Sequence, residues 1–169
     1  MSLLIFLLVA LIILIILLIG FIVFLLYPFL FGAGFEATDK KSIETMLKLA
    51  QPKKIDKVAD LGSGTGNIVI AFAKKGIQSV GFEINPLLVW YSRRRIRRLG
   101  LSHLAKIHRA NFFHENLSRF SIITIFQYSY VMPKLESHLP KNARILSNKW
   151  LFPSLKPKKK QGRIIIYKT

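Results

Sequence analysis

The sequence predicts an α/β protein with a small, mostly parallel sheet of about six strands, preceded by one N-terminal transmembrane helix. The chain opens with a long apolar run, and short strand-like segments then alternate with helical ones. A glycine-rich turn, DLGSGTG at residues 60–66, follows the first of these strands. Strands that alternate with helices favour a parallel sheet with right-handed crossovers.

The apolar run extends from Leu3 to Leu26 and contains no charged residue. As a helix it would be about 36 Å long, which exceeds the roughly 30 Å hydrocarbon core of a bilayer. A cleaved signal peptide would need a basic start and a shorter core, and the remaining domain is too small to enclose the run. The pattern therefore predicts an anchor over residues 1–30, with Tyr27 and Phe29 as an aromatic belt.

All charged residues lie after this run, beginning at Glu36, so the net charge of +18 belongs to residues 33–169. The positive-inside rule then predicts a single-pass protein with its N-terminus outside and its basic domain in the cytoplasm. Such a domain would bind anionic lipid or nucleic acid, and the anchor favours lipid. The lysine-rich run at residues 156–160 fits either partner, or a solvated turn before a last strand.

The chain has no cysteine, which excludes disulfides and thiol nucleophiles and fits a reducing compartment. We assign residues 31–56 to a linker and a first helix, and residues 57–169 to the main domain. The helix is expected at 39–50, where Ile43 and Met46 have helical spacing and Thr38 or Asp39 stands at the N-cap position.

The main domain alternates strands and helices. Six strands are expected, at residues 57–61, 79–84, 105–111, 121–127, 143–152 and 162–169. Three helices are expected between them, at residues 67–75, 86–99 and 133–139. Gly76 and Gly100 end the first two helices, and Pro86 suits the first turn of the second.

The glycine turn lies where α/β proteins bind nucleotide-like ligands. It lacks the Lys-Ser/Thr pair of a phosphate loop, and its third glycine does not fit the dinucleotide fingerprint. A tight turn without a ligand is the alternative. Glu83 ends the second predicted strand, where a carboxylate accepts hydrogen bonds from a ribose diol. Together with Asp60, Gly62 and Gly64, it indicates an adenosine site.

Two segments carry a family resemblance. VADLGSGTGNIVIAFAKKG resembles motif I of class I S-adenosylmethionine-dependent methyltransferases, and VGFEINPLLVWYSR resembles their acidic second motif. With the N-terminal anchor and the segment NARILSNKW, the chain is similar to the small membrane-anchored lysine methyltransferases of the ATP synthase c-subunit and the adenine nucleotide translocase. The resemblance implies a Rossmann-like methyltransferase sheet, S-adenosyl-L-methionine as cofactor and a membrane-protein substrate.

The resemblance also implies a set of cofactor-binding residues. They are Thr38, Asp60, Gly62, Ser63, Gly64, Gly66, Glu83, Asn111 and Phe112. Asn111 stands where many relatives have an acidic residue, and its amide would bond an adenine edge. Phe35 and Thr38 fall in a segment that resembles the loop over the cofactor, although this chain lacks the proline and tyrosine common there.

The implied reaction is an in-line methyl transfer from a sulfonium to a lysine amine. The amine must arrive neutral, although its free pKa is about 10.4, and a desolvated site beside a cation lowers that pKa. A strong general base is therefore not required. Gln127, Tyr128 and Tyr130, at the end of the fourth predicted strand, are the candidates to line the catalytic channel. Strand-end packing is the alternative interpretation.

The second predicted helix of the main domain combines Trp90 and Tyr91 with five arginines. This composition occurs in nucleic-acid sites, but we interpret it as a helix with Ile96 and Leu99 inward and the rest solvated or against lipid. The four histidines lack ligand-like spacing, so no metal is expected. Two further functions stay open: an RNA or lipid-headgroup methyltransferase, and a non-catalytic, membrane-bound cofactor-binding protein.

Overall fold

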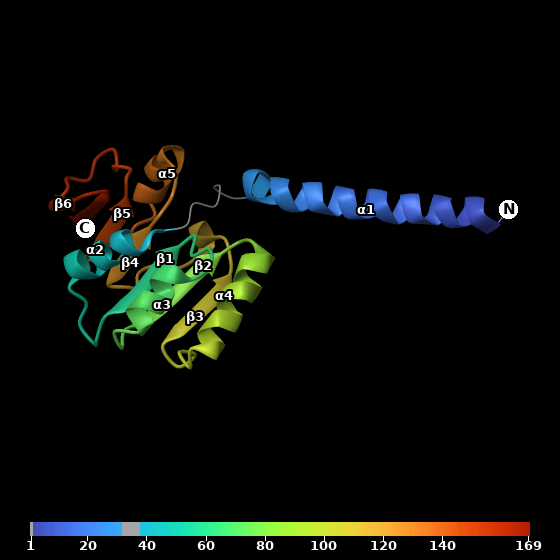
Figure 1. Ribbon diagram of the computed structural model, residues 1–169. Helices are drawn as coiled ribbons and strands as arrows, with labels where there is room; N and C mark the ends of the chain where they lie inside the picture. The colour runs from blue at the N-terminus through green and yellow to red at the C-terminus, as the bar shows by residue number, and fades with distance from the viewer. Residues whose placement is uncertain (1, 32–37) are drawn as a thin grey trace. The chain divides into compact units, whose positions relative to one another are not determined.

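The computed structural model describes the backbone of residues 2–31 and 38–169 and the side chains of residues 3–25 and 38–169 (Figure 1). The chain forms two compact units, residues 1–34 and residues 35–169. The predicted aromatic belt at Tyr27 and Phe29 and the loop residue Phe35 lie outside the described side chains.

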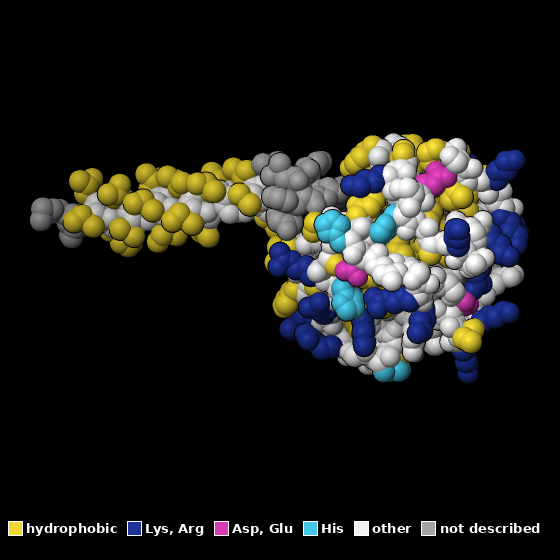
Figure 2. Space-filling model, turned by 180° about the vertical axis from the view of Figure 1, so that it is seen from behind, with side chains coloured by type: hydrophobic (Ala, Val, Ile, Leu, Met, Phe, Trp, Pro, Cys, Tyr) yellow, Lys and Arg dark blue, Asp and Glu magenta, His cyan; other side chains and the backbone are white. Residues whose placement is uncertain are grey.

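The first unit is helix α1 (Ser2–Phe31). Its segment Leu3–Leu25 has a mean hydropathy of 3.7 and the length of a membrane span. Apolar side chains cover the helix along its described length, and none of that segment is buried (Figure 2). A core helix of a soluble protein would be buried. The exposure therefore fits a helix whose solvent is lipid.

The second unit is a sheet of seven strands in the order β3-β2-β1-β4-β5-β7-β6. The five strands β1 to β5 are parallel, and β7 is antiparallel to both β5 and β6. The strands are β1 (Lys57–Leu61), β2 (Gln78–Glu83), β3 (Ala105–Arg109), β4 (Ile122–Ile125), β5 (Arg144–Asn148), β6 (Lys159–Gln161) and β7 (Ile164–Lys168). The predicted α/β class with a mostly parallel sheet is confirmed.

Three helices cover one face of the sheet and shorter segments cover the other. The first face carries α2 (Lys40–Ala50), α3 (Asn67–Ala73) and α4 (Pro86–Arg98). The other carries α5 (Met132–Glu136), which directly follows the short 3₁₀ turn η2 (Ser129–Val131), and a second 3₁₀ turn, η1 (Phe112–His114), which precedes β4 in the chain. Asp39 caps α2 through a bond from the Ser42 backbone, and Asn85 caps α4.

Two details of the sequence prediction were wrong. The sheet has a seventh strand, because Lys159–Gln161 pairs with β7 across a two-residue turn that begins at Gly162, whose φ is 59°. This lysine-rich segment has no β-branched residue and both its faces are exposed, so it carries no strand signal of its own. Leu99 is 46% exposed rather than buried, because the helix ends at Arg98 and the left-handed Gly100 then turns the chain.

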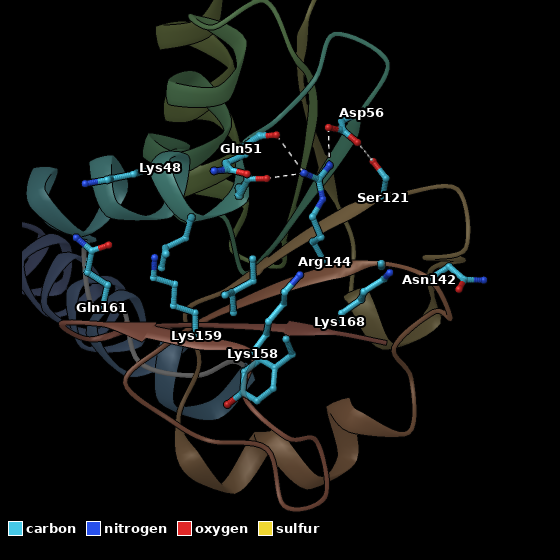
Figure 3. A pocket seen from close by; sticks show the side chains of 15 residues that line it. Lys48, Gln51, Asp56, Ser121, Asn142, Arg144, Lys158, Lys159, Gln161 and Lys168 are labelled. Carbon is cyan, nitrogen blue, oxygen red and sulfur yellow. Dashed lines mark hydrogen bonds and ion pairs between the residues drawn. The ribbon is translucent and has the colours of Figure 1, made fainter.

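A hollow of about 620 Å³ lies where β1, β4 and β5 begin (Figure 3). Arg144 lies at its centre, donates to the Ala50 and Gln51 carbonyls at the end of α2, and pairs with Asp56. Burial by itself raises the pKa of Asp56, but the Lys53 backbone N–H and the Arg144 guanidinium hold that pKa below its usual value. Arg144 thus joins α2 to the amino end of the sheet.

Replacing Arg144 with alanine should destabilise the second unit by about 2 kcal/mol, because the buried Asp56 and two helix carbonyls lose their donor. Chemical unfolding of the full chain in mild detergent measures this loss. Lys168→Ala is the matched control, since Lys168 lines the same hollow but is exposed. Equal losses in the two variants would contradict the role given to Arg144.

Candidate active site

The parallel strands end at one edge of the sheet, which we call the carboxyl edge. Strand order reverses between β1 and β4, and α/β proteins bind ligands in the crevice outside such a switch point. The glycine turn follows β1, Glu83 ends β2, and Gln127 follows β4. The fold therefore brings the main sequence-predicted residues to one edge.

The glycine turn, residues 62–66, lies directly on the end of β2. The backbone N–H groups of Gly62 and Ser63 both donate to the Phe82 carbonyl, at 2.9 and 3.0 Å. Gly62 and Gly66 have φ values of 82° and 77°, which residues with a Cβ rarely adopt. The turn therefore needs glycine at these positions for its shape, whether or not a ligand is present.

Arg95 of α4 clamps the same turn from the side. Its Nη1 donates to the Thr65 carbonyl and to the Asn67 amide oxygen, both at 2.7 Å. The sequence interpretation did not single out Arg95, because it is one of five arginines within six residues and nothing local distinguishes it. Its half-buried position in the fold assigns it this supporting role.

Glu83 is buried, and both its carboxylate oxygens point to backbone donors. Oε2 accepts from the Gly64 N–H and Oε1 from the Asn85 N–H, each at 2.8 Å. Each oxygen keeps a further lone pair, so this fixed carboxylate can accept hydrogen bonds from a vicinal diol. Glu83 ends β2, as predicted, and its binding of a ribose stays a prediction.

Asp60 is 2% exposed, and its Oδ1 accepts from the Thr124 hydroxyl at 2.7 Å. Burial raises the pKa of Asp60 to about 7; the Thr124 bond opposes this rise, and the nearby Glu83 charge adds to it. The carboxyl is therefore near its midpoint at neutral pH. A cationic ligand group arriving at this edge would favour the ionised form.

Gln127 lies over the glycine turn. Its Nε2 donates to the Leu61 carbonyl at 3.0 Å, and a Cβ built on Gly62 would approach that nitrogen to 2.1 Å. Tyr128 and Tyr130 stack in parallel with ring centroids 5.8 Å apart, and Tyr130 is 70% exposed. Gln127 thus touches the turn, whereas the two tyrosines form a separate aromatic pair that follows it.

The remaining predicted residues have supporting places. Ser63 is buried against Gly81, whose built Cβ would lie 2.5 Å from the Ser63 hydroxyl. Asn111 is exposed and caps η1 by accepting from the Phe113 N–H, which leaves its amide NH₂ free for another partner. Phe112 is half-buried against Phe113, with ring centroids 4.6 Å apart. Thr38 is half-buried just before α2.

Asn148 is a further candidate that sequence reasoning missed. It ends β5 at the carboxyl edge and is 2% exposed, and neither its amide oxygen nor its nitrogen has a partner in the described part of the chain. Buried polar atoms are nearly always hydrogen-bonded, so such an orphan group indicates a missing ligand or water. By strand alternation, Asn148 shares the α2 and α3 face of the sheet with Asp60. Only its place within NARILSNKW could have drawn attention to it.

Comparison with known proteins identifies the family. Residues 60–159 match the ANTKMT methyltransferase domain. The chain belongs to this family. The ATP synthase c-subunit lysine N-methyltransferase of Xenopus laevis is 41% identical over 104 residues, covering 59% of this chain and 46% of that protein. A protein-lysine N-methyltransferase of Saccharolobus islandicus is 32% identical over 127 residues, covering 72% of this chain and 79% of that protein.

A crystal structure of an RNA methyltransferase from Salinibacter ruber, in complex with S-adenosyl-L-homocysteine, has the same fold. Its TM-score is 0.72 at 27% identity, covering 78% of this chain and 91% of that chain. The chain spans about half the length of its vertebrate curated relatives. The predicted methyltransferase family and fold are confirmed. The fixed Glu83 carboxylate, the glycine turn and the orphan Asn148 amide fit S-adenosylmethionine, the family's cofactor.

Gly62→Ala should weaken S-adenosyl-L-homocysteine binding by at least about tenfold, because the new methyl displaces Gln127 and strains the turn. Isothermal titration calorimetry measures the affinity. Gly76→Ala is the matched control, since Gly76 has a similar φ of 78° but open space around it. A Gly62→Ala protein that binds as tightly as this control would contradict the assigned geometry.

Asp60 should make stability depend on pH. Its folded pKa of about 7 exceeds its unfolded value of 3.8, so the folded state holds the proton more tightly and stability falls as pH rises from about 4 to about 7. The full difference corresponds to about 4 kcal/mol. Asp60→Asn should remove this slope while keeping an oxygen for Thr124. Chemical unfolding at several pH values checks it, and parallel wild-type and variant curves would show that Asp60 is already ionised.

Proposed function

We propose that this protein is a membrane-tethered S-adenosylmethionine-dependent methyltransferase that N-methylates a lysine of a membrane protein. The observation that carries the proposal is membership of the ANTKMT methyltransferase family together with the membrane-length helix α1. The curated relatives include lysine methyltransferases of the ATP synthase c-subunit and of the adenine nucleotide translocase. Those two names support the choice of lysine and of a membrane-protein substrate.

Residues of the carboxyl edge would hold the cofactor. Glu83 would accept hydrogen bonds from the cofactor's ribose, and the backbone of the glycine turn could approach the cofactor closely. Asn111 and Phe112 would contact its adenine. Asn148 and Asp60 would offer polar contacts on the α2 and α3 face. When bound, S-adenosylmethionine supplies a methyl group on a sulfonium, an electrophile that a neutral amine attacks in line.

The protein's own task is then to position and desolvate the lysine amine. Gln127 is the best-placed residue, because it already lies on the glycine turn and its amide oxygen can accept from an amine. The aromatic pair of Tyr128 and Tyr130 would form a wall past which the aliphatic lysine stem enters. A low-dielectric wall beside a cation lowers the pKa of the amine, so deprotonation needs no dedicated base.

The anchor gives this small domain access to its substrate. Tethering raises the effective concentration of membrane proteins near the site, without a separate recognition module. We propose a single-pass arrangement with the N-terminus outside and the catalytic unit in the cytoplasm, since every lysine and arginine follows α1.

RNA methylation is the second candidate. Two observations favour it: the solved structure with a TM-score of 0.72 is that of an RNA methyltransferase, and the chain carries a net charge of +18. The 41% identity to a curated lysine methyltransferase outweighs the 27% identity to that structure. An RNA substrate would give methyl transfer that falls steeply with added salt.

The test supplies methyl-tritiated S-adenosylmethionine to membranes from a strain lacking this protein, with the purified full chain added back. We expect one labelled protein band that yields methyl-lysine on hydrolysis. Glu83→Ala should reduce the label at least about tenfold, because the variant loses the buried carboxylate that holds the Gly64 N–H and would accept hydrogen bonds from the ribose. Glu44→Ala, an exposed carboxylate on α2, is the matched control and should label normally.

Three results would contradict the proposal. Label that enters RNA, or lipid, instead of protein would move the assignment to that substrate. Label at a residue other than lysine would remove the lysine assignment. No transfer at all by a folded protein that binds S-adenosyl-L-homocysteine would leave the fold and the cofactor site and remove the activity.

A further inference from the structure

Helix α4 presents one exposed face whose side chains belong to none of the hydrophobic core clusters of the described residues. We call the α4 face the set Leu87, Trp90, Tyr91, Arg94 and Arg98, whose spacing of i, i+3, i+4, i+7 and i+11 places them on one side of the helix. The opposite side is buried on the sheet through Val89, Ser92 and Ile96. The outward side of α4 therefore carries large apolar groups together with arginines, whereas the outward side of an ordinary surface helix is polar.

Those apolar groups are strongly exposed. Leu87, Trp90 and Tyr91 are 52%, 58% and 47% exposed. Arg94 lies over the Trp90 ring and Arg95 over the Tyr91 ring, with guanidinium carbons 5.8 and 5.7 Å from the ring centroids. Tryptophan and tyrosine side chains with an apolar body and a polar tip favour the level of the lipid headgroups. The first half of the α4 face thus has the chemistry of a membrane interface.

The second half of the α4 face is cationic without any acidic neighbour in sequence. No aspartate or glutamate occurs between Glu83 and Glu115. Arg94 and Arg98, with Arg97 beside them, are exposed and form no ion pair with any described residue, whereas Arg95 is committed to the glycine turn. These three arginines are free to contact anionic groups, and each basic residue at a membrane surface contributes roughly a fivefold factor in affinity.

We propose that the α4 face docks on an anionic lipid bilayer, with Leu87, Trp90 and Tyr91 at the headgroup level and the arginines on lipid phosphates. This inference rests on the proposed function in one respect, that α1 anchors the domain to a membrane. Pro86 begins α4 three residues after Glu83, so the aromatic half of the face lies at the carboxyl edge of the sheet. Docking would hold the candidate active site against the bilayer surface, where a lysine of a membrane protein is presented.

The chain length between the anchor and the domain allows this docking. Helix α1 ends at Phe31 and α2 begins at Lys40, so the connection reaches at most about 30 Å. The end of α2 is bound to Arg144 at the start of β5, so its first turn points toward the carboxyl edge. The tether therefore enters the domain at the edge that docking would bring to the membrane.

Trp90 is a built-in reporter for the test. The full chain carrying Trp150→Phe, so that Trp90 is the only tryptophan, is reconstituted into vesicles of phosphatidylcholine alone or with about one third phosphatidylglycerol. A nitroxide-labelled lipid in the outer leaflet should quench Trp90 in the anionic vesicles only, and high salt should abolish the quenching. Trp90 that stays open to aqueous acrylamide and is not quenched by the labelled lipid would overturn the proposal.

Charge-matched variants distinguish docking through α4 from the general attraction of a basic protein to an anionic membrane. Arg97→Ala with Arg98→Ala should reduce the quenching, whereas Lys158→Ala with Lys159→Ala should not, because those lysines line the hollow at the other end of the sheet (Figure 3). Equal reductions by both pairs would overturn the assignment to α4, as would protection of Trp90 by added RNA in place of lipid. Thermal unfolding confirms that each variant is folded.

Two further measurements distinguish a failure of docking from a failure of the proposed function. Gln127→Ala, which removes the residue proposed to position the lysine amine and does not touch α4, should lower methyl transfer and keep the Trp90 quenching, so a failure of catalysis leaves docking measurable. Flotation of the full chain with neutral vesicles tests the anchor by itself. Anchored, active protein without Trp90 quenching would overturn docking and leave the proposed function standing.

Discussion

The hydrogen bond from the Gly64 N–H to Glu83 is the interaction on which the rest of the site depends. It joins the turn after β1 to the end of β2, and the second Glu83 oxygen holds the Asn85 N–H just before α4. One buried carboxylate thus sets the positions of the glycine turn, the end of β2 and the start of α4. The same group is the one that a ribose would contact, so the structural and binding roles of Glu83 cannot be separated by simple removal.

The neighbouring Asp60 shows how the fold tolerates a second buried acid. Burial raises the pKa of Asp60 to about 7. Two ionised carboxylates buried close together would also repel each other. The Glu83 carboxylate accepts from two backbone N–H groups, whereas the Asp60 side chain accepts from the Thr124 hydroxyl alone among the described residues. Burial, the largest cause, thus raises the pKa of Asp60 against the lowering effect of the Thr124 bond, and the nearby Glu83 charge adds to the rise.

The two ends of the sheet differ in their polar groups. At the amino end, Arg144 ties α2 to β5 and Asp56, and lysines line the hollow around it. At the carboxyl end, the described groups are backbone donors, carboxylates and amides from separate strands, such as Glu83, Gln127 and Asn148. Parallel strands necessarily bring their carboxyl ends together, so residues remote in sequence meet there.

The sequence alone determined the elements whose signal is local. Positive φ values favour glycine, a long uncharged run of apolar residues favours one continuous apolar helix, and a parallel sheet follows from alternating strands and helices; these rules predicted the turn, α1 and the fold class. Tertiary structure decided what depends on distant partners. Strand β6 exists because β7 pairs with it, Gln127 reaches the turn because β4 lies beside β1, and Arg95 and Asn148 gain their roles from burial. Long-range pairing and burial leave no mark on the neighbouring residues of the chain, and for that reason the sequence could not predict them.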